Sequence, residues 1–178
     1  REKHNFVVDI VYAKRDNQTT LVQVKVTASE AGVLHLLPMV WLRGNGYIQR
    51  LNWNGYDVAY NGGHFVVKTA TVPSSWQISA NATGKKGDFN RAITENKQLA
   101  NAGEGNRAAW DLALSLQAGE TQMLYLALAN AASTSEAEHN ADATLANRQA
   151  ILSMRQAEAE ALYRNQVTEH EDVYRYAL

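Results

Sequence analysis

The chain has 178 residues, with 17 Lys and Arg against 18 Asp and Glu, and it contains no cysteine. A chain of this length can bury a core without disulfides, and the lack of thiols excludes thiolate metal sites and a cysteine nucleophile. A net charge of −1 argues against nucleic acid as a partner. No run of 18 apolar residues occurs, so we expect no membrane partner or membrane span, and the composition fits cytoplasm and periplasm equally.

Alternating hydrophobic residues predict a β-hairpin at the start of the chain. Val22, Val24 and Val26 alternate with polar residues, a period of two that places the three valines on one buried face. The segment NFVVDIVYAK at 5–14 precedes them, and RDNQ at 15–18 supplies a turn.

The next segment, Val33–Leu42, is apolar in both of its alternating sets. This pattern predicts a central strand that is covered on both faces, as in a packed sandwich. Pro38 cannot donate a hydrogen bond to a ladder, so it requires a bulge or an edge position. Strict alternation puts His35 on the same side as Trp41 and Arg43, unless Pro38 introduces a bulge.

Strand patterns continue in HFVVKTATV at 64–72 and SWQISA at 75–80. Residues 81–106 are polar, and we expect a short helix within them at 91–100. A connection of this length is unusual between neighbouring strands, which indicates either mobility or a function.

Two leucine-rich strand patterns follow at 108–129. Trp110 and the leucines at 112, 114 and 116 share one face of the first, while the leucines at 124, 126 and 128 share one face of the second. The segment QAGET at 117–121 lies between them, and we expect it to close the two strands into a hairpin.

The composition changes after Asn130. Residues 133–166 contain no Gly or Pro and are rich in good helix formers, which predicts one long helix or two helices with a break near Asn140. Thr134 or Ser135 together with Glu138 resembles a capping box at the start.

These patterns divide the chain into an antiparallel β-sandwich at 1–130 and a helical linker at 131–178. The predicted fold class is therefore mainly β, with a long C-terminal α-helical linker. A further helix is expected to begin near 168–171, and its apolar pattern stops without a cap. The chain begins without an initiator methionine or a signal core, so we expect a processed chain or a piece of a longer one.

Three segments resemble a known family. His35–Arg43 reads HLLPMVWLR, Leu116–Thr121 reads LQAGET, and Arg155–Gln166 reads RQAEAEALYRNQ. They are similar to the H-x-L-P-x-x-W-x-R segment, the turn before the last sandwich strand and the linker helix in the N-terminal region of (α/α)6-barrel glycoside hydrolases, particularly the family 63 and mannosylglycerate-hydrolase-like group. The family segment often continues into Asn-Thr-Trp, whereas Arg43 is followed by Gly44.

The resemblance implies a supersandwich-like β-sandwich and a linker that leads toward an (α/α)6 catalytic domain of the same polypeptide, which would be its partner. It also implies a glucosidase-like parent enzyme of carbohydrate metabolism. The acid and base of the family lie in the barrel, so the resemblance assigns no catalytic residue to this chain.

The residues themselves indicate no complete catalytic or metal site. Glycoside hydrolysis uses two carboxyl groups about 5–10 Å apart, and the candidate carboxylates form no recognisable pair; Asp9 and Asp111 fit solvent-facing positions. Those candidates are Asp9, Asp57, Asp88, Glu95 and Asp111. The five histidines have no metal-like spacing, and no phosphate-loop or dinucleotide motif indicates a cofactor.

His35, Trp41 and Arg43 allow two interpretations. In the first, His35 is a buried, hydrogen-bonded core residue, Trp41 packs in the core and Arg43 ends the strand. In the second, Trp41 and Arg43 face the catalytic barrel and organise the domain interface, a role that suits the five donors of a guanidinium group.

Aromatic residues concentrate between 41 and 76, among Gly and Asn turns. Trp53 and Tyr56 border turns and are the candidates for stacking on an oligosaccharide. The alternative is that the aromatic residues pair across a hairpin.

Three hypotheses for the function follow. The first is the non-catalytic sandwich region of a glycoside hydrolase, which braces the catalytic barrel and shapes its substrate pocket. The second is a free-standing carbohydrate-binding sandwich. The third is a structural module that docks on a partner through its long helix.

Overall fold

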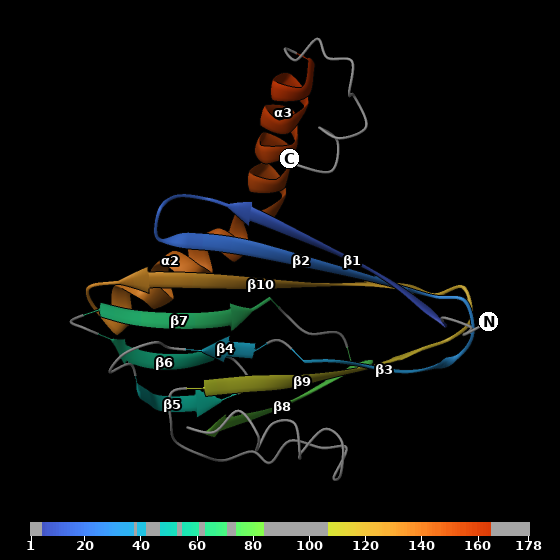
Figure 1. The fold of residues 1–178 in the computed structure, drawn as a ribbon, viewed down its shortest axis with the longest axis horizontal. Helices are drawn as coiled ribbons and strands as arrows, with labels where there is room; N and C mark the ends of the chain where they lie inside the picture. Colours follow the sequence, from blue (N-terminus) through green and yellow to red (C-terminus); the bar gives the residue numbers. More distant parts are fainter. Residues whose placement is uncertain are drawn as a thin grey trace.

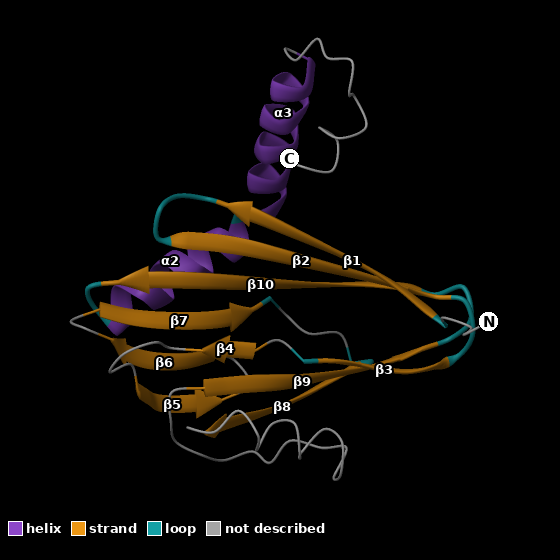
Figure 2. Ribbon diagram, in the orientation of Figure 1, coloured by secondary structure: helices purple, strands orange, loops and turns teal. Residues whose placement is uncertain are grey.

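The computed structural model describes residues 5–37, 39–41, 47–52, 55–60, 63–70, 74–83 and 107–164. This part of the chain forms two antiparallel β-sheets, followed by two helices (Figures 1 and 2). The predicted mainly-β sandwich with a helical C-terminal segment is confirmed.

The larger sheet has six strands in the order β1-β2-β10-β7-β6-β5. They are β1 (Phe6–Lys14), β2 (Thr19–Ala28), β10 (Thr121–Ala131), β7 (Gly63–Thr69), β6 (Gly55–Tyr60) and β5 (Tyr47–Asn52). The predicted first hairpin is confirmed, because β1 pairs with β2 along its whole length. Asp16 stabilises the turn, since its Oδ1 accepts a 2.8 Å hydrogen bond from the backbone N–H of Gln18.

The smaller sheet is built around β9 (Arg107–Leu116). β8 (Trp76–Thr83) pairs along one side of β9, and both β3 (Gly32–Leu36) and β4 (Met39–Trp41) pair along the other. The register does not change between β3 and β4, since Leu36 pairs with Leu112 and Met39 pairs with Ala109. The two short strands therefore occupy the same strand position beside β9, one on each side of residue 38.

The prediction that Val33–Leu42 is a central strand is wrong. Among the described strands, β9 holds the central position and β3 and β4 form an edge. Leu34 and Leu36 pack against the core, whereas Val33 is 55% exposed. The segment thus lies at an edge, one of the two positions expected for a strand that contains a proline.

The main core lies between the two sheets. Because side chains alternate along a strand, every second residue of β2, β9 and β10 points inward. These inward residues are Val22, Val24 and Val26 of β2, Leu112, Leu114 and Leu116 of β9, and Leu124 and Leu126 of β10. The buried faces predicted for the valines and leucines are confirmed, with Leu128 only partly buried, whereas the side chain of Trp110 lies outside the described residues. Each buried side chain contributes about 1.5–3 kcal/mol.

The hairpin predicted for 108–129 is wrong, because β9 and β10 belong to different sheets. Their leucine rows face each other across the sandwich instead of lying side by side. The connecting turn docks on the end of β2: Gly119 N–H donates to the Ala28 carbonyl at 2.8 Å, and Ala28 N–H donates to the Glu120 carbonyl at 3.0 Å. Gly119 has a φ of 79°, a conformation that side chains disfavour.

Helix α2 (Thr134–Ala146) covers part of the outer face of the larger sheet. Its Ala141 and Leu145 pack with Leu21 of β2 and with Ala127 and Ala129 of β10 in a second core. Small alanines on both sides let the helix backbone approach the sheet closely. The helical segment is therefore docked on the sandwich from its start.

The helix boundaries differ from those predicted. Ser133 is the N-cap of α2 and accepts a 3.3 Å hydrogen bond from Glu136 N–H, so the S-x-x-E pattern begins one residue before Thr134. The break falls at Asn147, not near Asn140, and its side-chain amide donates to the Ala143 carbonyl at 2.8 Å.

Helix α3 (Arg148–Arg164) leaves the sandwich beside β1 (Figure 1). Arg155 fixes its direction by donating hydrogen bonds to the backbone carbonyls of Lys14 and Arg15. Arg15 in turn donates to the Asn140 carbonyl and to the Thr144 hydroxyl of α2, each at 3.1 Å. The two arginines thus tie the β1–β2 turn to both helices.

Three other expectations concern the segments between and after these elements. Residues 81–83 belong to β8 and not to the polar segment. The helices expected at 91–100 and near 168–171 lie outside the described residues. No described helix is long and apolar enough to cross a membrane.

We predict that Leu114→Ala lowers the free energy of unfolding by about 2–5 kcal/mol, because Leu114 has no exposed surface and its loss leaves a cavity between the sheets. Val33→Ala, at an exposed position of the same sheet, is the matched control and should cost about 0.5 kcal/mol or less. Urea unfolding measures both, and equal effects would contradict the assigned core.

Candidate functional site

The candidate site lies on the outer face of the smaller sheet, where β3 runs beside β9. His35 is directly opposite Ala113, and Asp111 is diagonally opposite, two residues along β9. This diagonal brings the two side chains together, and the distance from His35 Nδ1 to Asp111 Oδ1 is 2.8 Å. A register shift of one residue would place them on opposite faces.

The two partners differ in exposure. The Asp111 side chain is 8% exposed and that of His35 is 48% exposed. An ionised Asp111 accepts the Nδ1 proton and holds the imidazole in one orientation, which leaves Nε2 for solvent or another partner. The arrangement therefore presents an oriented imidazole at the edge of the sheet.

The sequence predicted these two residues only in part. His35 is hydrogen-bonded as expected, but it is half exposed and not buried. The expectation that Asp111 faces solvent is wrong, because the outer face of β9 is covered there and the neighbouring Ala109 is 2% exposed. An isolated aspartate in an alternating pattern gives no signal for such a cover, so sequence reasoning named Asp111 only as a candidate carboxylate and missed its pairing with His35.

The other proposed interface residues are less fully described. Trp41 ends β4 and pairs with Arg107 of β9. Arg43 lies outside the described residues. The interface role of both residues stays a prediction.

The carbohydrate candidates also stay a prediction. Trp53 lies outside the described residues, and Tyr56 is in β6, where its backbone pairs with Leu51 of β5. β5 and β6 form the expected antiparallel pair. Within that pair no aromatic residue is directly opposite another, since Tyr47 pairs with Ala59.

Three of the candidate carboxylates, Asp9, Asp57 and Asp111, lie on different strands, β1, β6 and β9. Asp9 is exposed on β1 opposite Lys25, and Asp57 pairs with Arg50 and Val66 on β5 and β7. Asp88 and Glu95 lie outside the described residues. Within the described ranges, no group of three or more His, Asp or Glu residues could hold a metal ion.

The turn LQAGET has a clear structural role. Glu120 Oε2 accepts a 2.9 Å hydrogen bond from the backbone N–H of Gln117, and Oε1 accepts another of the same length from the Gln122 amide. These two donors, the backbone N–H first, lower the pKa of Glu120 from its usual value. The two hydrogen bonds of Glu120 and the positive φ of Gly119 stabilise the turn locally.

The third segment of the resemblance, residues 155–166, falls in α3 as far as Arg164. Its first residue is the arginine that binds the carbonyls of Lys14 and Arg15. The remaining two positions lie outside the described residues.

Comparison with known proteins finds similarity among solved structures. No family model matches the sequence, and no curated protein matches it. Among solved structures, the chain is similar to a bacterial glucoamylase complexed with acarbose, with a TM-score of 0.48 and 17% sequence identity. The match covers 79% of this chain and 22% of the glucoamylase chain.

We predict that His35 and Asp111 are energetically coupled. His35→Ala removes the partner of a buried carboxylate and should cost about 1–3 kcal/mol, whereas in an Asp111→Asn background the same substitution should cost less. A double-mutant cycle by urea unfolding measures the coupling. Strict additivity would show that the 2.8 Å contact contributes nothing to stability.

We also predict a pH-dependent role for Glu120. Because folding lowers the pKa of Glu120, its stabilising effect is present above the unfolded pKa and is lost as the pH falls through the folded pKa. Glu120→Gln should therefore destabilise the protein at pH 7 but have little effect below both pKa values. Thermal melts of both proteins across this pH range test the assignment, and an equal loss of stability at every pH would contradict it.

Proposed function

We propose that this chain is the non-catalytic N-terminal β-sandwich region of a glycoside hydrolase of the family 63 or mannosylglycerate-hydrolase-like group. In the intact enzyme it braces a helical catalytic domain of the same polypeptide and shapes one wall of the sugar-binding pocket. The observation that carries the proposal is the HLLPMVW segment, His35–Trp41, on an edge of the smaller sheet.

An edge position suits a contact with another domain. Inner strands are covered by their neighbours, whereas β3 exposes Val33 and half of His35. The buried Asp111 holds the imidazole of His35 in place, so a second domain would meet an ordered donor or acceptor. An apolar side chain beside an ordered polar group is a suitable contact for a stable domain interface.

The helices support the same proposal from the other end of the chain. α2 is packed on the larger sheet, and Arg155 fixes where α3 leaves it. A helix that is anchored at its start and directed away from the sandwich suits a rigid connection between two domains (Figure 1). The resemblance assigns this connection to a linker before the first helix of an (α/α)6 barrel.

The proposal separates binding from catalysis. The resemblance assigns no catalytic residue to this chain, so the acid and the base would come from the helical domain. The substrate class of the intact enzyme would be a glucoside, and Trp53 and Tyr56 would be available for sugar contacts. His35, Trp41 and Arg43 would lie at the domain interface.

The direct test compares the 178-residue chain with the longer polypeptide that the proposal requires. We expect the chain alone to cleave none of a panel of nitrophenyl glycosides and disaccharides, while the longer polypeptide cleaves at least one glucoside. Release of sugar by the purified 178-residue chain would contradict the proposal, as would a longer polypeptide without a helical domain.

Sugar titrations followed by tryptophan fluorescence distinguish the proposal from a free-standing binding module. We expect the isolated chain to bind sugars more weakly than millimolar, because only one wall of the pocket is present. Tighter binding that Trp53→Ala abolishes, and that the exposed control Tyr12→Ala retains, would favour the binding module instead.

A further inference from the structure

The outer edge of β1 is an unpaired strand edge. In the β1–β2 ladder, Arg15 N–H donates to the Thr19 carbonyl and Ser29 N–H to the Asn5 carbonyl. These bonds show that the odd-numbered residues of β1 make the hydrogen-bonded pairs with β2. The even-numbered residues from Phe6 to Lys14 therefore direct their N–H and C=O groups away from the sheet.

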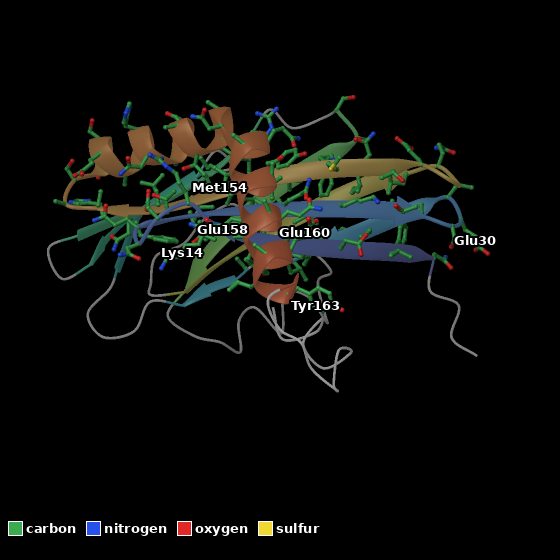
Figure 3. All side chains as sticks on the ribbon, turned by 90° about the horizontal axis from the view of Figure 1, so that it is seen from above. Lys14, Glu30, Met154, Glu158, Glu160 and Tyr163 are labelled. Carbon is green, nitrogen blue, oxygen red and sulfur yellow. The ribbon has the colours of Figure 1, made fainter. Side chains whose placement is uncertain are left out.

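Helix α3 caps one end of this edge. Arg155 donates to the outward carbonyl of Lys14, and α3 crosses the strands near Lys14, far from Glu30 at the opposite end (Figure 3). Among the described residues, no group bonds the outward backbone atoms of Phe6, Val8, Ile10 or Tyr12. The uncapped edge thus extends from Phe6 to Tyr12.

This edge is also apolar. In the described part of the chain, half of the large hydrophobic side chains that are exposed belong to β1: Val7, Ile10, Val11 and Tyr12. Natural proteins usually protect a long apolar edge with charges, proline or a covering element. Here Asp9 is the one acidic residue of the strand, and it lies opposite Lys25 of β2.

We propose that the β1 edge binds β1 of a second copy of this chain, antiparallel, with a twofold axis at Ile10. Only an extended strand can pair with alternating outward N–H and C=O groups. The proposed register puts Ile10 opposite Ile10 and Val8 opposite Tyr12, with about six backbone hydrogen bonds. The result is one sheet that continues through both copies.

The charge pattern selects this register. Pairing must join even-numbered residues to even-numbered ones, so the alternatives are shifted by one pair in either direction. One shift puts Asp9 opposite Asp9, and like charges directly opposite are destabilising. The other puts Val8 opposite Lys14, whose carbonyl Arg155 already occupies, and leaves only the pairs between Ile10 and Tyr12 fully available. With Ile10 on the axis, Asp9 faces Val11.

In this register, helix α3 would cover part of the sheet of the second copy. Arg155 sits at the β1 edge, and Leu162 lies seven residues further along α3, about 10 Å away. Strands are about 4.8 Å apart, so Leu162 would reach over the first two strands of the second copy. There Ala13 of one copy is opposite Val7 of the other. Leu162 and Val7 are 54% and 60% exposed, and the dimer would bring them together.

A single cysteine tests the axis directly, because the chain has no other thiol. In Ile10→Cys the two Cα atoms of the dimer would be about 5.5 Å apart, within the range that a disulfide bridges. Mild oxidation should convert most of this variant into a covalent dimer. Val33→Cys, on an exposed edge of the other sheet, is the matched control and should stay mainly monomeric.

Sedimentation of the unmodified chain supplies the second readout. We expect a dimer at high micromolar concentration, weakened at least about tenfold by Ile10→Lys and several-fold by Leu162→Ser. Circular dichroism confirms that both variants fold, since each side chain is at the surface. A monomer at all concentrations would overturn the proposal, as would equal cross-linking of Ile10→Cys and Val33→Cys. Both outcomes are independent of glycosidase activity.

Discussion

The apolar rows between the two sheets are the contact on which the rest of this structure depends. Leu112, Leu114 and Leu116 of β9 meet the valines of β2 and the leucines of β10 across the sandwich. Each sheet buries one face in this contact, and the larger sheet also packs against α2 on its other face. The position of β3, and with it the site at His35, follows from the place of β9 in the core.

The same contact determines how the outer surfaces are used. With their inner faces buried, β9 and β3 can bring His35 and Asp111 together only on the outer face of the smaller sheet. On the opposite side of the molecule, α2 uses the outer face of the larger sheet as its base. The proposed interface and the proposed linker thus occupy different sheets of one sandwich.

Period-two patterns predicted the strands and their inward faces, because alternation is a local property of the sequence. They could not predict which strands become neighbours. The leucine rows of 108–129 fit a hairpin as well as two strands in opposite sheets, and only the docking of Gly119 and Glu120 on Ala28 decides between them. The edge position of Val33–Leu42 escaped prediction for the same reason.

The sequence predicted the part of the candidate site that has a local signal, and it missed the part that depends on contacts between distant segments. His35 stood out as a polar residue in an apolar strand, but Asp111 became its partner through a diagonal register between segments 76 residues apart. The break at Asn147 depends similarly on tertiary contacts, since α2 must lie on the sheet while α3 crosses β1. Composition alone allows one helix or two and does not locate the break.

Native-state hydrogen exchange tests most directly whether both sheets share one core. If they do, the slowest amides of β2, β9 and β10 will exchange only on global unfolding and will report the same free energy. Amides of β9 that exchange much faster than those of β2 and β10 would show that the smaller sheet opens on its own, which contradicts the account.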